Sequence, residues 1–152
     1  MSIQIRGARR EDRPAILALA HTTLGEFDFT FGTGSASDVQ LEGAPESFHP
    51  GVLYVAMSGD ELVGMAGVYP LGEGLWELRK MFLRVASRGQ GIGQQLLERC
   101  ITFVRGKDGR TVVLDTAEAM DKAIALYERN GFVRDDTQQR ASRCQRGYRL
   151  DL

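Results

Sequence analysis

The hydrophobic positions of the chain follow two periods, and a strand and a helix are visible near the N-terminus. Ile3 and Ile5 alternate with polar residues, as in a strand with one buried face. In segment 11–27 the apolar residues recur every three or four positions, and Asp12 can cap the first turn. The pattern predicts a strand followed by a helix.

The middle of the chain changes from an irregular segment to three strands. Segment 26–51 has no clear period and carries five acidic residues without a Lys or Arg, although 38–41 is compatible with a short helix. Two β-rich runs at 52–57 and 62–70 flank a Gly-Asp turn and predict a hairpin. A further run at 76–83 predicts a third antiparallel strand.

Beyond the third strand, helical and extended patterns alternate again. The predicted elements are a helix over 92–106, a strand over 110–116, a helix over 118–130, and two strands that begin at 132 and 147. Asp115 or Thr116 can cap the second of these helices. The predicted order is one strand and one helix, three strands, and then helix, strand, helix, strand, strand.

Length and composition predict one globular domain over residues 1–152. The chain is 43% hydrophobic, contains no run of eighteen apolar residues, and does not begin with the apolar stretch of a signal peptide. We therefore expect a cytoplasmic protein without a membrane partner. Two distant cysteines and two histidines do not form a metal-binding pattern, so we expect no metal and assign Cys100 and Cys144 no catalytic role.

The net charge of -1 conceals an asymmetry between the two halves of the chain. Residues 1–76 hold 4 Lys and Arg against 10 Asp and Glu, a balance of 4 - 10 = -6, and residues 77–152 hold 15 against 10, or +5. The second half therefore favours an anionic ligand. No basic stripe is interleaved with aromatic residues, so nucleic-acid binding is not expected.

Three glycines stand at alternate positions in SRGQGIGQQLL (87–97), directly before a helical pattern. A glycine loop at a helix N-terminus exposes unpaired N–H groups at the positive end of the helix dipole, which suits a phosphate. A tight turn before a closely packed helix would need only one glycine. A Walker loop requires Lys after Gly93, and the dinucleotide fingerprint requires a later glycine, but Gln94 and Leu96 occupy the relevant positions.

Arg88, Gly91 and Gly93 instead fit the pattern Arg/Gln-x-x-Gly-x-Gly/Ala. With the preceding strand and the later segment AIALYERNGF (123–132), the chain resembles the GCN5-related N-acetyltransferases, the GNAT superfamily. The resemblance implies an α/β (α+β) fold with a mixed, mostly antiparallel sheet of six to seven strands flanked by helices. The strands at 76–83 and 110–116 would splay apart to admit acetyl-CoA.

By the same resemblance, acetyl-CoA serves as co-substrate. Its pyrophosphate would lie on the backbone amides of the glycine loop, and backbone groups at the end of the strand 76–83 would pair with the pantetheine arm and hold the acetyl carbonyl. The cofactor-binding residues implied are Met81, Phe82, Leu83, Arg88, Gly89, Gln90, Gly91, Ile92 and Gly93.

Tyr127 matches the family's tyrosine general acid and would protonate the sulfur of CoA; its alternative role is to pack its ring in the core. Glu77 matches a glutamate that serves as general base in several subfamilies. Strand periodicity predicts that Glu77 shares one face with Arg79, Met81 and Leu83. Its alternative role is an ion pair with a neighbouring cation. Many relatives carry asparagine where this chain has Met120, so that amide is replaced or absent.

The predicted activity is direct transfer of an acetyl group to a primary amine of a small molecule or peptide. The acceptor site would be lined by segment 26–50, whose acids favour a cationic amine, and by segment 134–146, whose arginines favour a carboxylate. Two alternatives stay open: a module that binds acetyl-CoA or CoA as a sensor, and a transferase of a longer acyl group. A homodimer is common in such folds, but the sequence identifies no interface.

Overall fold

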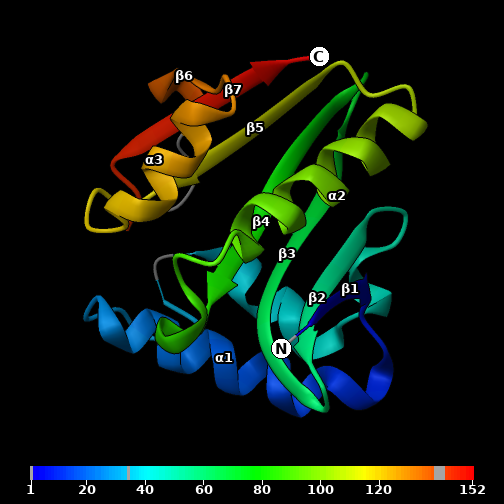
Figure 1. The fold of residues 1–152 in the computed structure, drawn as a ribbon. Helices are drawn as coiled ribbons and strands as arrows, with labels where there is room; N and C mark the ends of the chain where they lie inside the picture. Colours follow the sequence, from blue (N-terminus) through cyan, green and yellow to red (C-terminus); the bar gives the residue numbers. More distant parts are fainter. Residues whose placement is uncertain (1, 34, 139–142) are drawn as a thin grey trace.

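The computed structural model describes residues 2–33, 35–138 and 143–152, in which one central sheet carries helices on both faces (Figure 1). The strands are β1 (Ile3–Gly7), β2 (Val52–Ser58), β3 (Glu61–Gly72), β4 (Leu75–Leu83), β5 (Thr111–Thr116), β6 (Val133–Arg134) and β7 (Arg146–Asp151). The α-helices are α1 (Arg13–Glu26), α2 (Ile92–Gly106) and α3 (Asp121–Arg129). The described strands follow the order β1-β2-β3-β4-β5-β7-β6, which confirms the predicted fold class.

Short connections determine the first half of the sheet. β2, β3 and β4 follow one another through tight turns and pair antiparallel, and β1 joins the outer edge of β2. The turn between β2 and β3 contains Gly59 at φ 60°, a left-handed conformation that glycine adopts without strain. The hairpin predicted from the apolar runs is therefore confirmed.

Each face of the sheet has its own hydrophobic core. Side chains of α2 and α3, including Leu96, Leu97 and Ile124, pack with Val68 and Val112 of the sheet on one face. On the other face, α1 packs with two 3-10 helices, η2 (Ala36–Gly43) and η3 (Glu46–Phe48). The separation of these cores leaves the sheet as the wall between two sides of the molecule.

β4 and β5 are parallel neighbours for only part of their length. Leu75, Trp76 and Glu77 pair with Thr111, Val112 and Val113, and no pairing between the two strands continues beyond Glu77 within the described residues. From there the strands diverge (Figure 1). The predicted splay between these two strands is confirmed, and it leaves strand edges available to a ligand.

The side-chain capping bonds expected for α1 and α3 do not form, although Asp12 is the N-cap residue of α1. α3 begins at Asp121 after Met120, later than predicted, and neither Asp115 nor Thr116 caps it, because a turn over 117–120 separates the strand from the helix. Asp12 precedes α1, but its carboxylate accepts hydrogen bonds from the Arg9 amide (2.7 Å) and from Arg6 instead of capping that helix.

The irregular segment after α1 is largely built from the 3-10 helices η2 and η3, so the short helix suggested around 38–41 is present in a longer form.

Among the described residues, no helix combines the length and the apolar character that crossing a bilayer requires.

Candidate active site

The glycine loop lies at the N-terminus of α2. Gly89 and Gly91 have φ of 76° and 79°, and a Cβ at either position would meet no heavy atom within 4 Å. Their requirement for glycine is therefore conformational. Gly93 differs, because a Cβ there would lie 3.3 Å from side-chain atoms of Leu83 and Leu126. Two glycines thus shape an open backbone and the third lets helix α2 pack closely.

A cavity of about 580 Å³ opens beside this loop. Its wall comes from the end of β4, the glycine loop, the first turn of α2, α3 and the end of α1. Of the predicted cofactor residues, those that line it are Met81, Phe82, Leu83, Arg88, Gly89, Gly91, Ile92 and Gly93. Gln90 is absent from this lining, and its side-chain amide nitrogen donates to the Ala86 carbonyl oxygen at 3.2 Å.

Arg88 connects the loop with its surroundings. Its guanidinium forms two hydrogen bonds to the Glu26 carboxylate, of 2.8 and 2.9 Å, and donates to the Leu83 carbonyl oxygen. Arg88 therefore holds the end of β4 against the end of α1 at the rim of the cavity. The backbone N–H groups at the start of α2 supply a site for an anion.

A bulge interrupts β4 at the point where the strands diverge. Lys80 has φ 59°, and the pairing with β3 passes from Gly67–Arg79 to Met65–Phe82, so β4 contains one residue more than β3 in this interval. An inserted residue reverses the side-chain alternation beyond it. Residues of the same parity, odd or even, therefore point to opposite faces of the sheet before and after the bulge.

The prediction that Glu77, Arg79, Met81 and Leu83 share one face is wrong for this reason. Met81 and Leu83 pack with the α2 side of the sheet. Arg79 instead donates to the Gln40 amide oxygen of η2 at 2.9 Å and forms an ion pair with Glu77. Glu77 and Arg79 thus lie on the η2 side.

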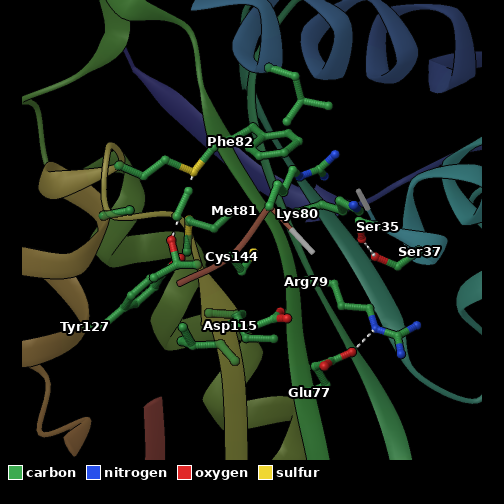
Figure 2. Close-up of a pocket in the computed structure, with 18 residues that line it drawn as sticks. Ser35, Ser37, Glu77, Arg79, Lys80, Met81, Phe82, Asp115, Tyr127 and Cys144 are labelled. Carbon is green, nitrogen blue, oxygen red and sulfur yellow. Dashed lines mark hydrogen bonds and ion pairs between the residues drawn. The ribbon is translucent and has the colours of Figure 1, made fainter. Parts of the chain in front are cut away.

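A second, smaller cavity of about 80 Å³ lies where β4 and β5 diverge (Figure 2). It is lined by Glu77 and Tyr127, which the sequence singled out separately, and Figure 2 shows them approaching it from different elements. Glu77 is 5% exposed and pairs with Arg79, so the ion pair considered as its alternative role does form. That pair does not remove Glu77 from the cavity wall.

Tyr127 is 5% exposed and belongs to the core of the α2 side, with its ring centroid 5.7 Å from that of Phe132. Burial raises the pKa of its phenol above the ordinary value. The hydroxyl therefore remains protonated at neutral pH. Tyr127 is thus a core residue that also lines the smaller cavity.

Several residues of this cavity were not singled out from the sequence, although four of them lie in the two segments expected to line the acceptor site. They are Asp115 of β5, Lys80 of the bulge, Ser35 before η2, Ser37 in η2, and Arg143 and Cys144 before β7. Strand alternation could have identified Asp115. Val113 lies opposite Glu77, and Asp115, two residues further along β5, lies on the same face as Val113. Lys80 belongs to the predicted strand 76–83, whose pattern does not reveal the bulge, and the remaining residues come from segments without a hydrophobic period.

The environment of Cys144 disfavours a nucleophilic thiolate. Burial, followed by the charge of Asp115, raises the pKa of its thiol to about 12. The thiolate is therefore scarce at neutral pH. Within the described residues, no group of three or more His, Cys, Asp or Glu side chains could hold a metal ion. Of the arginine-rich segment 134–146, residues 139–142 lie outside the described residues.

Comparison with known sequences gives consistent matches. The model of the Acetyltransferase (GNAT) family matches residues 18–132. YjgM of Escherichia coli (strain K12), described as an uncharacterized N-acetyltransferase, is 30% identical over 128 residues, which are 80% of this chain and 77% of that protein. Mycothiol acetyltransferase of Geodermatophilus obscurus is 31% identical over 109 residues, 68% of this chain. The match spans only 35–39% of that protein and of other curated relatives.

Solved structures share the fold. A GNAT-family acetyltransferase from Staphylococcus aureus Mu50 superposes with a TM-score of 0.87 at 19% identity, and the match covers 99% of each chain. The PaiA N-acetyltransferase of Thermoplasma acidophilum, solved in complex with coenzyme A, gives a TM-score of 0.76 at 18% identity over 100% of both chains.

Proposed function

Because the chain belongs to the acetyltransferase (GNAT) family and is therefore an acyltransferase, we propose that it transfers an acetyl group from acetyl-CoA to a primary amine. The acceptor is a small molecule or a peptide. The observation that carries the proposal is the junction of the two cavities. Met81, Phe82, Met120 and Ala123 line both of them. Tyr127 and Glu77 line the smaller cavity, and the shared residues support a path for the thioester from the larger cavity to them.

The larger cavity fits acetyl-CoA. Its open glycine backbone at the N-terminus of α2 suits a pyrophosphate, and the strand edge freed by the splay suits the amide groups of pantetheine. Acetyl-CoA supplies a thioester carbon that an amine attacks. The C–N bond forms and the C–S bond breaks. The nitrogen of the ammonium loses two protons on becoming an amide: one is released to solvent, and the other is balanced by the proton that the departing sulfur gains.

Tyr127 and Glu77 would carry these protons. The Tyr127 phenol, kept protonated by burial, donates to the departing sulfur. Glu77, held by Arg79, takes a proton from the acceptor amine directly or through a water. Met120 contributes a thioether to both cavities at the position where many relatives carry an amide, so polar contacts to the cofactor would come from the backbone.

A thiol-release assay with acetyl-CoA and a broad panel of amines tests the proposal. We expect free CoA to appear with at least one amine. A module that only senses the cofactor would bind acetyl-CoA in calorimetry and release no thiol with any acceptor. If calorimetry detects no binding, both the transferase and the sensor are excluded.

The role of Glu77 requires a matched pair of variants, Glu77→Gln and Arg79→Gln, because either change breaks the same ion pair. If Glu77 is the base, Glu77→Gln lowers kcat about 100-fold, the typical contribution of such a group, whereas Arg79→Gln retains the carboxylate and loses much less. Equal losses in the two variants would reduce Glu77 to a structural partner of Arg79.

A further inference from the structure

Resting on the proposed function, the inference concerns the acceptor. A buried charge cluster forms the wall of the smaller cavity on the η2 side. Asp38 of η2 is fully buried and pairs with both Lys80 and Arg143. Arg143 binds its two carboxylate oxygens at 2.7 and 2.8 Å and also donates to the Thr33 carbonyl oxygen at 2.8 Å. Two cations against one carboxylate give the cluster one net positive charge.

The two cations of the cluster line the cavity and retain donor capacity. The side chains of Lys80 and Arg143 are 5% and 10% exposed. Arg143 uses three of its five N–H groups, and Lys80 one of three, in hydrogen bonds to the described residues. Ser35 and Ser37, whose hydroxyls lie 2.9 Å apart, add two further polar groups on the same side.

Electrostatics within the cluster favours an additional anion. Burial, which outweighs the attraction of Asp38, lowers the pKa of Lys80, and the charge of Arg143 lowers it further. An anion that entered beside Lys80 would reverse this effect, because an opposite charge stabilises the ammonium. An incoming carboxylate can also satisfy the remaining N–H groups with charge-assisted hydrogen bonds.

The cavity also carries two carboxylates that suit an amine. Asp115 lies on β5 beyond the last pair of the parallel ladder and lines the cavity with Tyr127, and Glu77 reaches the same space from the η2 side of β4. Figure 2 shows Lys80, Ser35 and Ser37 gathered on one side, while Tyr127 and Asp115 approach from α3 and β5. A carboxylate on β5 is suited to hold an ammonium group near the attacking position.

From this polarity we infer that the acceptor is a small zwitterion of the amino-acid type, whose carboxylate binds Lys80 and Arg143 and whose ammonium lies against Asp115 and Glu77. The hydrogen bonds from Arg143 to Asp38 and Thr33 also join the segment before β7 to the segment after α1. The linked segments both line the cavity, and its volume of about 80 Å³ favours a small acceptor over a folded protein.

The test compares three forms of each acceptor in the thiol-release assay: the free amino acid, its amide, and the amine that lacks the carboxyl carbon. The panel includes the common amino acids and ω-amino acids of increasing chain length. We expect at least one free acid to have a kcat/KM about tenfold or more above its amide and amine, the scale of a lost charged hydrogen bond. Equal values for the three forms, or a preference for the amide or amine, would overturn the inference and leave the proposed function intact. No thiol release with any compound would overturn both.

Arg143→Gln should remove the preference for the free acid by raising its KM, while the amide and amine keep theirs. Arg134→Gln is the matched control, because Arg134 comes from the same arginine-rich segment but pairs with Asp136 at the surface. Lys80→Met provides a second variant if Arg143→Gln is poorly folded by circular dichroism. Equal losses for all three acceptor forms in both cavity variants would show a structural role only and contradict the inference.

Discussion

The hydroxyl of Tyr127 has an environment that suits a proton donor. The ring is fixed in the core beside Phe132, and burial raises the pKa of the phenol. A phenol that cannot ionise at neutral pH is available to a thiolate that leaves with an unperturbed pKa near ~8.5. Burial therefore keeps Tyr127 in the protonated form that the proposed role requires, while the raised pKa makes the phenol a weaker acid.

Replacing Tyr127 by Phe tests this role with a minimal change of shape. We expect kcat to fall about 100-fold, because only the proton donor is removed, while calorimetry gives an unchanged affinity for acetyl-CoA. Leu126→Met, a volume-conserving change at the adjacent position of α3, serves as control and should retain most of the activity. Unchanged turnover in Tyr127→Phe would exclude the hydroxyl as the acid.

The sequence predicted those site residues that belong to short motifs. The glycine loop follows from local spacing and Tyr127 from the resemblance of AIALYERNGF to the family's segment, and both line the cavities. The partners of Asp38 could not be predicted, because Lys80 and Arg143 lie 42 and 105 positions further along the chain. Such pairings depend on the packing of segments that carry no hydrophobic period.

Among the elements, the glycine loop and helix α2 form one unit. Gly91 is the N-cap residue in a left-handed conformation, and its carbonyl oxygen accepts the Gln95 amide at 3.1 Å. The first N–H groups of a fifteen-residue helix then face the larger cavity. The direction of these amides depends on a backbone conformation that L-residues other than glycine rarely adopt.

Gly91→Ala should therefore destabilise the protein although there is room for the added methyl group. We expect the free energy of unfolding in urea to fall by about 1 kcal/mol and the affinity for acetyl-CoA to fall with it. Gly106→Ala is the control: it ends the same helix with equally open surroundings but no positive φ. A helix site gains up to about 1 kcal/mol from this change. Equal stability changes in the two variants would contradict the conformational explanation.

The hydrophobic period and the turn residues predicted every strand and α-helix of the described residues in the correct order. The period did not predict the bulge at Lys80, because an inserted residue leaves the hydrophobic character of WELRKMFL unchanged while it reverses the faces. The consequence is functional: Glu77 and Met81 lie on opposite sides of β4, and the opening between β4 and β5 brings both to the same cavity.

For the whole molecule, the divergence of β4 and β5 separates the sheet into two halves that need other connections. Asp38 provides one, because it joins η2 on the α1 side to the bulge of β4 and to the segment before β7. Both cations stabilise its buried carboxylate as an anion. The ionised form of Asp38 therefore helps to hold the cavity wall together.

Acid should weaken this connection. Burial alone would raise the pKa of Asp38, but the hydrogen bonds from Arg143 and Lys80 outweigh it and hold the pKa below its ordinary value. A depressed folded-state pKa contributes stability that is complete above the unfolded value of ~3.9 and is lost as the pH falls through the folded value.

Asp38→Asn should therefore lower the free energy of unfolding by about 3 kcal/mol at pH 7, and its deficit relative to the wild type should shrink below pH ~4. Urea unfolding at pH 7, 5, 4 and 3 measures both quantities. Asp60→Asn in the exposed β2–β3 turn is the control and should match the wild type at pH 7. A deficit that stays constant down to pH 3 would show that the Asp38 charge does not stabilise the fold, and that the shape of its side chain alone matters.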